Sequence, residues 1–336
     1  MTVIRRFCRI ECRMKIFRIF LCIAMIAFLV LSPKALVRKA QQSYVDPRFV
    51  RDSEKYRGSI LLYHVVRHRP YSGSMTQWLK TKAAAYEKKH KGTFIEIEGM
   101  DEQHYYERME SGRRPDAYSF FSGTLYPDRL KEIEDLHIPY RKGLFQTDRC
   151  IPYCYTGYCK LYKSQNVADG KTYFANEVLA ARADDATDRT TEDKADLLYL
   201  DLRRAGDLIR YKDGFTLSSI EPIDNFTDAV CWMGIDRETG DAKTAVILDF
   251  IAFLTEPDTQ QSLNALGLFS VRYDVRNVFP EPILKRIFKI YDSVRTVDPF
   301  AWNANYDAIT EDAALAAKGD ADARERFANR LRECLR

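Results

Sequence analysis

Two histidines, His64 and His68, lie four positions apart and could bind one metal ion together if their segment were helical. The segment 59–66 is instead a continuous apolar run, which is typical of a buried parallel strand. On a strand the two rings are separated by about 13 Å, whereas zinc requires donor atoms at about 2 Å. We therefore expect no metal site there.

The sequence contains none of the common motifs of an active site or of a bound cofactor. There is no Gly-x-Ser-x-Gly, no His-Glu-x-x-His and no Gly-x-x-x-x-Gly-Lys-Ser/Thr phosphate loop. Glu96 and Glu98 share one face of a predicted strand, away from its end, where solvated side chains are common. We expect a protein that is not an enzyme and that has no cofactor.

Aromatic residues are the chemically useful groups that the chain does supply, with 20 Tyr, 19 Phe and 3 Trp. A sugar packs its C–H face on an aromatic ring while a few polar groups bind its hydroxyls. Some rings belong to the core, however. Trp78 lies on the inner face of a predicted amphipathic helix over 75–90, so we expect it to be buried there.

The first third of the chain predicts alternating strands and helices. The expected elements are a strand at 59–66, a helix at 75–90, a strand at 93–98, a helix at 101–109 and a strand at 116–121. This βαβαβ order predicts a doubly wound half-domain, in which ligands bind beyond the C-terminal ends of the strands. Residues 67–74 and 122–126 should therefore line one wall of a cleft.

Two polar residues follow these strand ends directly. Arg67 could make paired hydrogen bonds to a ligand, although an exposed loop arginine is usually only solvated. Ser122 follows the third strand, where its backbone amide could bind a ligand hydroxyl. A further strand at 195–202 ends near Asp201 and Arg203, for which a salt bridge is the simpler interpretation.

Residues 221–272 carry the longest pattern in the chain. They predict a short buried strand, a turn and then an amphipathic helix, whose apolar residues recur at helical spacing. A short helix should follow, beginning at Glu256-Pro257-Asp258 and ending at Gly267, and after it a closing strand. The order of these elements and their residues resemble the second crossover of bacterial extracellular solute-binding proteins, which are the capture subunits of ABC importers. Arg114-Pro115-Asp116, Ile151-Pro152-Tyr153 and the pair of C-terminal helices around Gly319-Asp320 extend the resemblance to residues 59–335. Tyr162-Lys163 and the shortened stretch 164–194 depart from it.

The resemblance implies an α/β fold of the periplasmic-binding-protein type (type II), with two lobes that are each a mixed sheet flanked by helices. The expected parts are a basic tail (1–18), an apolar helix (19–33), a spacer (34–57), lobe 1 (58–149 plus 233–270) and lobe 2 (150–232 plus 271–336). The implied function is capture of a small solute in a closing cleft between the lobes. A sugar or oligosaccharide is the implied ligand, and a separate permease and ATPase are the implied partners.

The same resemblance points to four aromatic residues. Trp232 matches a position close to the hinge and cleft of the family, and Trp302 lies in a C-terminal aromatic cluster that often stacks on sugars there. Tyr153 and Tyr155 alternate along the strand that crosses into the second lobe, so at most one of them is expected to face the cleft.

Two alternative functions remain at this point. An anchored sensor or accessory domain would keep the fold without transport, which the shortened second lobe and the missing lipid-acceptor cysteine would suit. A secreted enzyme acting on glycans would need two carboxylates about 5 to 10 Å apart in the cleft.

The basic character of the chain is confined to its N-terminal tail. Residues 1–39 contain nine Lys or Arg and one acidic residue, whereas the rest contains 43 basic and 47 acidic residues, so a nucleic-acid partner is not expected. Basic residues precede the apolar run 19–33 and orient its N-terminus to the cytoplasm. We expect an uncleaved membrane anchor, or alternatively a cleaved signal peptide, with residues 40–336 outside the cytoplasm in either case.

Five of the eight cysteines lie in this exported part: Cys150, Cys154, Cys159, Cys231 and Cys334. An odd number leaves at least one cysteine unpaired. Cys150 and Cys154 would be too far apart on one strand for a disulfide. A bridge from one of them to Cys231 and a set of small buried apolar residues are both compatible with the spacing.

Overall fold

The structure is a computed structural model that describes residues 56–124, 129–163, 171–183, 189–211, 215, 220–223, 226–289 and 291–335. The predicted basic tail, the apolar helix at 19–33 and nearly all of the spacer at 34–57 lie outside these residues. Among the described helices, none combines the length and the apolar character needed to cross a bilayer.

Strands and helices alternate through much of the chain, as the sequence predicts. The strands are β1 (Gly58–Val65), β2 (Thr93–Met100), β3 (Ala117–Phe121), β4 (Ile151–Tyr155), β5 (Tyr158–Tyr162), β6 (Thr172–Phe174), β7 (Leu197–Asp201), β8 (Ile220–Pro222), β9 (Phe226–Thr227), β10 (Val230–Ile235) and β11 (Arg295–Thr296). The α-helices are α3 (Met75–Lys89), α4 (Glu102–Glu110), α5 (Glu177–Arg182), α6 (Leu202–Tyr211), α7 (Asp241–Leu254), α8 (Pro257–Ser262), α9 (Pro282–Phe288), α10 (Pro299–Ala316) and α11 (Ala321–Cys334). The described residues also form the 3₁₀ helices η2 (Glu192–Lys194) and η4 (Leu263–Leu266).

The larger sheet in the described part of the chain has the strand order β2-β1-β3-β10-β4. Strands β1, β2 and β3 run parallel, which confirms the predicted βαβαβ half-domain. Strand β10 returns antiparallel to β3, and β4 pairs antiparallel to β10. The result is a mixed sheet whose three parallel strands end at one edge, where the loops after β1 and β3 emerge.

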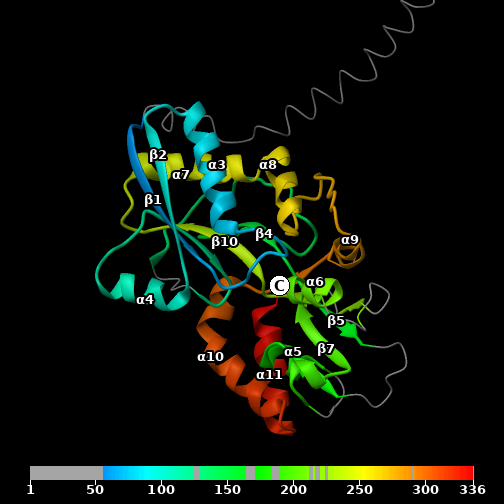
Figure 1. Cartoon of the computed structure of the whole chain (residues 1–336). Helices are drawn as coiled ribbons and strands as arrows, with labels where there is room; N and C mark the ends of the chain where they lie inside the picture. The colour runs from blue at the N-terminus through cyan, green and yellow to red at the C-terminus, as the bar shows by residue number, and fades with distance from the viewer. Residues whose placement is uncertain are drawn as a thin grey trace, which may run out of the picture. The chain divides into compact units, whose positions relative to one another are not determined.

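This sheet is covered on both faces, because successive side chains of each strand point to opposite sides. Helices α3 and α7 cover one face and α4 lies on the other (Figure 1). The inner face of α3 consists of the residues predicted from its periodicity, Met75, Trp78, Leu79, Ala83 and Tyr86. The prediction that Trp78 is a core residue is confirmed, since only 8% of it is exposed.

The smaller sheet has the order β6-β7-β5-β8, with β6 and β7 parallel and β5 antiparallel to both β7 and β8. Helices α10 and α11 pack against each other and, with α5, form a separate apolar cluster around Trp302 and Phe327. Asp312 on α10 accepts hydrogen bonds from Arg326 (2.8 Å) and Arg330 (2.9 Å) of α11. The predicted pair of C-terminal helices, separated at Gly319-Asp320, is therefore confirmed.

The chain passes between the two sheets twice, and the two passages are bonded to each other. It leaves the larger sheet after β4 and returns to it at β10. Thr156 donates its backbone N–H to the carbonyl of Ala229 (3.0 Å), and the Thr227 hydroxyl donates to the Thr156 carbonyl (2.6 Å). Such paired connections are the geometry in which a small number of backbone rotations can move one sheet relative to the other.

Residues 241–267 follow the predicted order closely. Helix α7 buries most of its predicted apolar residues, Pro257 is the first residue of α8, and Gly267 ends η4 with a positive φ of 74°. The predicted closing strand is wrong. The segment after Gly267 makes only isolated bridges among the described residues, Phe269 with Tyr155 and Arg272 with Tyr140, because it lies beside the crossing point rather than inside a sheet.

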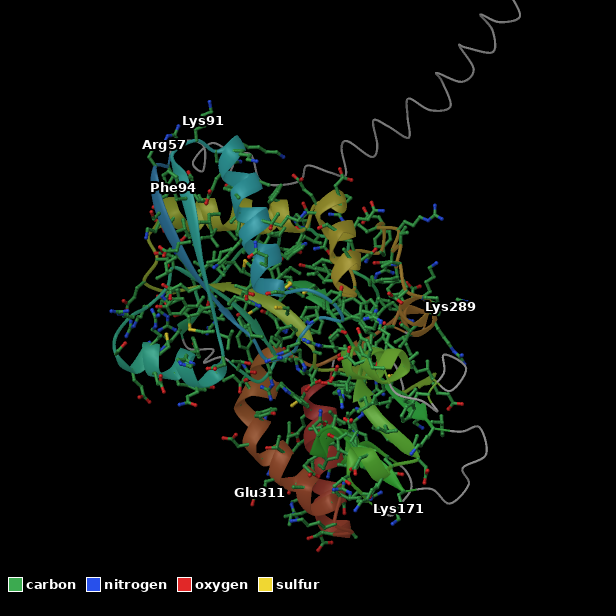
Figure 2. All side chains as sticks on the ribbon, viewed as in Figure 1. Arg57, Lys91, Phe94, Lys171, Lys289 and Glu311 are labelled. Atoms are coloured by element: carbon green, nitrogen blue, oxygen red, sulfur yellow. The ribbon has the colours of Figure 1, made fainter. Side chains whose placement is uncertain are left out.

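All five described cysteines are free and buried. This agrees with the interpretation of the cysteines as small buried apolar residues, and no disulfide to Cys231 is formed among them. Cys154 nevertheless lies directly opposite Cys231 in the β4–β10 register. Few large apolar side chains of the described residues reach the surface. One of them is Phe94 on β2, 58% exposed, which lies with Arg57 and Lys91 at one end of the larger sheet (Figure 2).

Candidate functional site

A pocket with a volume of about 380 Å³ lies where the two sheets meet. Its wall consists of Arg67, His68, Arg69, Tyr71, Thr156, Gly157, Tyr158, Asp201, Leu202, Arg203, Arg204 and Asp207. Three segments supply them: the loop after β1, the passage from β4 to β5, and the junction of β7 with α6. The pocket thus occupies the C-terminal end of a parallel strand in the larger sheet, the usual place for a ligand in open α/β sheets.

The loop after β1 is attached to elements on both sides of the pocket. Arg67 makes an ion pair with Glu102 (3.3 Å) and places its guanidinium carbon 4.2 Å from the centre of the Tyr306 ring on α10. Farther along, the Tyr71 hydroxyl accepts a hydrogen bond from Arg210 of α6 (2.9 Å). These contacts place the loop between the helices of the larger sheet and those of the smaller sheet.

Helix α6 can approach this loop because residue 206 is glycine. A Cβ atom added to Gly206 would lie 2.2 Å from the Tyr71 ring, which is too close for any side chain. Burial raises the pKa of Tyr71, so its hydroxyl is protonated at neutral pH and can also donate a hydrogen bond. The approach of α6 brings its N-terminal residues 202–204 to the pocket wall.

The floor of the pocket is formed by the passage between the sheets. Tyr158 donates its hydroxyl to Asp228 (2.7 Å) and its backbone N–H to the Tyr291 hydroxyl (3.0 Å). Burial, followed by the charge of Asp228, raises the pKa of Tyr158 well above its usual value. The neighbouring Gly157 lies so close to the Tyr291 ring that an added Cβ would stand 2.3 Å from it. This floor is closely packed and fixed by hydrogen bonds.

His68 is the described wall residue that has a buried polar atom without a hydrogen-bond partner. Its ring lies edge-on to Phe121, with 5.0 Å between the centroids, and its Nε2 is buried without a hydrogen-bond partner among the described residues. Burial lowers the pKa of His68, so the ring is neutral at pH 7 and offers one donor and one acceptor nitrogen.

Of the six residues predicted to bind ligand, Arg67 lies on the pocket wall. Ser122 and Trp232 are brought together, but inside the core: the indole N–H donates to the Ser122 hydroxyl (2.9 Å) and neither residue is exposed. Tyr153 and Tyr155 are also fully buried on β4. In this conformation these side chains cannot reach a solute without a rearrangement of the core.

The remaining predicted residue, Trp302, lies in the apolar cluster of α10 and α11 and is likewise fully buried. Its ring is 6.2 Å from both Phe226 and Tyr306, measured between centroids. The predicted contacts of Trp302 with ligand therefore remain a prediction, as do those of Trp232 and the two tyrosines.

Sequence reasoning assigned no binding role to the second wall of the pocket, residues 201–207. Asp201 ends β7, and its carboxylate accepts the backbone N–H of Arg204 (3.0 Å) as the cap of α6. The sequence did contain an indication of this wall, since the rule that ligands bind at strand ends applies to β7 as well as to β1. For Asp201 and Arg203 a salt bridge between the lobes or a local ion pair was expected instead, and neither residue makes an ion pair among the described residues.

We compared the chain with known proteins. No protein-family model matches the sequence, and no curated protein sequence does. Solved structures with the same fold include a chitin oligosaccharide binding protein, with a TM-score of 0.55, 14% identity and coverage of 83% of this chain and 99% of that chain. The GacH receptor of Streptomyces glaucescens, determined unliganded and with acarbose, matches with a TM-score of 0.54, 11% identity and coverage of 82% and 97%.

A third structure with this fold is the Atu4243-GABA receptor, with a TM-score of 0.53, 14% identity and coverage of 77% of this chain and 98% of that chain. At these identities the comparisons establish the fold alone. The chain has the two-lobed α/β fold of bacterial extracellular solute-binding proteins.

Proposed function

We propose that this protein is an extracytoplasmic solute-binding protein that captures a small polar solute in the pocket between its two sheets. The observation that carries the proposal is the position of the pocket, at a strand end and beside the two passages that connect the sheets. Pockets for small ligands usually measure about 300–1,000 Å³. A volume of about 380 Å³ is at the lower end of that range and favours a small solute over a long oligosaccharide.

We place the hinge of the two proposed lobes at residues 156–157 and 226–229, because these segments connect the sheets. A sugar is the ligand class that the similar structures favour, since two of them are proteins for oligosaccharides or acarbose. The pocket volume of about 380 Å³ favours one or two sugar units. Residues 19–33 are proposed to anchor the chain in the cytoplasmic membrane, and a separate permease and ATPase to receive the solute.

The first test measures thermal unfolding of the full-length protein in detergent with a panel of neutral sugars, sugar acids, sugar phosphates and amino acids. A ligand present at 100 times its Kd stabilises a protein by about 2.7 kcal/mol. We expect at least one panel member to raise the unfolding temperature, and Asp207→Trp to abolish that rise. Asp207 lines the pocket and makes no hydrogen bond or ion pair among the described residues, so the bulky ring can fill the space.

Asp307→Trp is the matched control, because Asp307 lies on an exposed face of α10 outside the pocket wall. It should retain the response to ligand in full. Two results would count against the proposal: a panel without any stabilising ligand, or an Asp207→Trp variant that responds like the wild type.

A second measurement separates transport from an anchored sensor. Uptake of the identified solute, in radioactive form, should fall at least tenfold in cells that lack this protein and should return with the wild-type gene. The Asp207→Trp gene should not restore it. Unchanged uptake in the deletion strain would favour the sensor.

The alternative of an enzyme acting on glycans has one observation in its favour, since two carboxylates, Asp201 and Asp207, line the pocket. The Asp201 carboxylate already caps α6 through the Arg204 amide, which occupies one of the two groups that such chemistry needs. Chromatography of a glycan panel after incubation with the protein tests this alternative, and we expect no product.

A further inference from the structure

Four arginines on the pocket wall differ in whether their charge is already compensated. Arg67 is paired with Glu102 at 3.3 Å. Arg204 donates to Glu192 through two nitrogens, one of them at 2.8 Å. Arg69 and Arg203 make no ion pair and no hydrogen bond from their side chains to any of the described residues. Two arginines of the pocket wall thus have no anionic partner among the described residues.

These two arginines come from different segments of the pocket wall. Arg69 belongs to the loop after β1, on the side of the larger sheet, and Arg203 lies in the first turn of α6, on the side of the smaller sheet. Arg203 is half-buried, whereas Arg69 is exposed. An anion between them would connect the two sides of the pocket, and guanidinium groups bind carboxylates and phosphates through paired hydrogen bonds.

The charges around the pocket also favour a negatively charged ligand. The N-terminus of α6 carries partial positive charge toward the pocket, because its first N–H groups have no partner within the helix. Of the two wall carboxylates, Asp201 is bonded to the amide of Arg204 at this helix end. Asp207 lies further along α6 and opposes an anion there, so the anion should bind on the side of Arg69 and Arg203.

His68 supplies an independent indication that the wall is completed by a ligand. Its Nε2 is buried and lacks a partner among the described residues, although a buried polar group without a hydrogen bond costs about 1–3 kcal/mol. His68 precedes Arg69 in the loop after β1, and both line the same pocket as Arg203. A ligand with both an anionic group and a hydroxyl would provide a partner for Arg69, Arg203 and His68.

We propose that the solute is a small anion, carrying a carboxylate or a phosphate group, held between Arg69 and Arg203 with His68 hydrogen-bonded to a neutral polar group. This inference rests on the proposed function and names its ligand class. An acidic sugar, such as a uronic acid or a sugar phosphate, has both kinds of group, whereas a neutral sugar leaves the two guanidinium groups without an acceptor.

Isothermal titration of the full-length protein in detergent tests the inference with four probes: glucose, glucuronate, glucose 6-phosphate and inorganic phosphate. We expect at least one anion to bind at least tenfold more tightly than glucose. Glucuronate and glucose 6-phosphate distinguish a carboxylate from a phosphate, and inorganic phosphate tests whether the anionic group alone is sufficient. Affinity should fall as the salt concentration rises, since the attraction is between charges.

Arg203→Gln should weaken binding of the anion about 10- to 100-fold, which corresponds to the loss of hydrogen bonds to a charged group. Arg69→Gln should weaken it less, about 3- to 10-fold, because an exposed charge is screened by solvent. Arg203→Lys should retain part of the affinity. Arg276→Gln is the control, since Arg276 is exposed, lies outside the pocket wall and makes no ion pair among the described residues.

The outcomes separate this inference from the function on which it rests. Glucose binding as tightly as the anions, or an unchanged affinity in both Arg203→Gln and Arg69→Gln, would overturn the anion while leaving solute capture intact. Absence of binding for all four probes and for the wider panel would overturn both. Unfolding temperatures of the unliganded variants, expected within a few degrees of the wild type, show that a lost affinity does not reflect a lost fold.

Discussion

Replacement of Trp232 by alanine is expected to lower the free energy of unfolding by about 3–5 kcal/mol, the range for deletion of a buried Trp side chain. The side chain is fully buried in the apolar core. Its indole N–H donates to the equally buried Ser122 hydroxyl at 2.9 Å, so the variant also removes the partner of that hydroxyl. Urea unfolding followed by circular dichroism measures the change.

Two further variants show which part of the side chain matters. Trp232→Phe keeps most of the volume and loses the N–H donor, so a smaller loss of about 1–2 kcal/mol is expected. Phe94→Ala is the control for removal of a large aromatic side chain, because Phe94 is 58% exposed on β2, at one end of the larger sheet (Figure 2). That variant should stay within about 0.5 kcal/mol of the wild type.

The Trp232 result also decides between two roles. A side chain that stacks on a solute would weaken binding when removed and would leave the unliganded protein nearly as stable as before. A side chain of the core would do the reverse. A loss of stability below about 1 kcal/mol, together with a large loss of affinity, would restore Trp232 as a ligand-binding residue and contradict its burial here.

The sequence could predict the larger sheet because the patterns that specify it are local. The inner face of α3 follows from the spacing of five apolar residues, and the parallel order of β1, β2 and β3 follows from alternating strands and helices. The same reasoning located one wall of the pocket, since the loop after a parallel strand lies at a known edge of the sheet.

The aromatic residues show where such reasoning ends. A tryptophan close to a hinge in sequence lies in a cleft or in the core according to what packs on its other side. For Trp232 that is Phe145, 6.0 Å away between ring centroids, in a stretch without helix or strand. The second wall of the pocket depends on contacts between distant segments, such as the approach of α6 to Tyr71 at Gly206. No local pattern of residues 201–207 contains that contact.

Acidification from pH 7 to pH 5 is expected to remove about 2 kcal/mol of stability through His64 alone. Burial in the core lowers the pKa of His64 from 6.5 to about 4. The unfolded chain therefore binds a proton between these two values while the native protein does not, and stability is full above pH 6.5 and falls as the pH decreases toward 4. The complete loss is about 3 kcal/mol, at about 1.4 kcal/mol for each unit of pKa.

The groups that face the ring explain why it stays neutral. His64 Nδ1 shares a hydrogen bond with the Ser119 hydroxyl (2.8 Å), which in turn bonds to the Tyr153 hydroxyl (2.6 Å) and lies 3.7 Å from the Cys231 sulfur. Burial raises the pKa of Tyr153, so its hydroxyl is neutral as well. His64 Nε2 is buried and has no partner among the described residues. No carboxylate contacts the ring there, and a proton on it would be an uncompensated buried charge.

The measurement is the free energy of unfolding in urea at pH 7, 6 and 5 for the wild type and for His64→Asn, whose amide can replace Nδ1 in the bond to Ser119. His68 contributes with the same sign, because burial lowers its pKa too, but it is present in both proteins and cancels in the comparison. The variant should be less stable at pH 7 yet lose about 2 kcal/mol less on acidification. His137→Asn, at a histidine side chain that is 63% exposed, should follow the wild type. Parallel curves for wild type and His64→Asn would mean that the His64 ring takes up its proton in the folded protein, and hence that the core around Ser119 admits water.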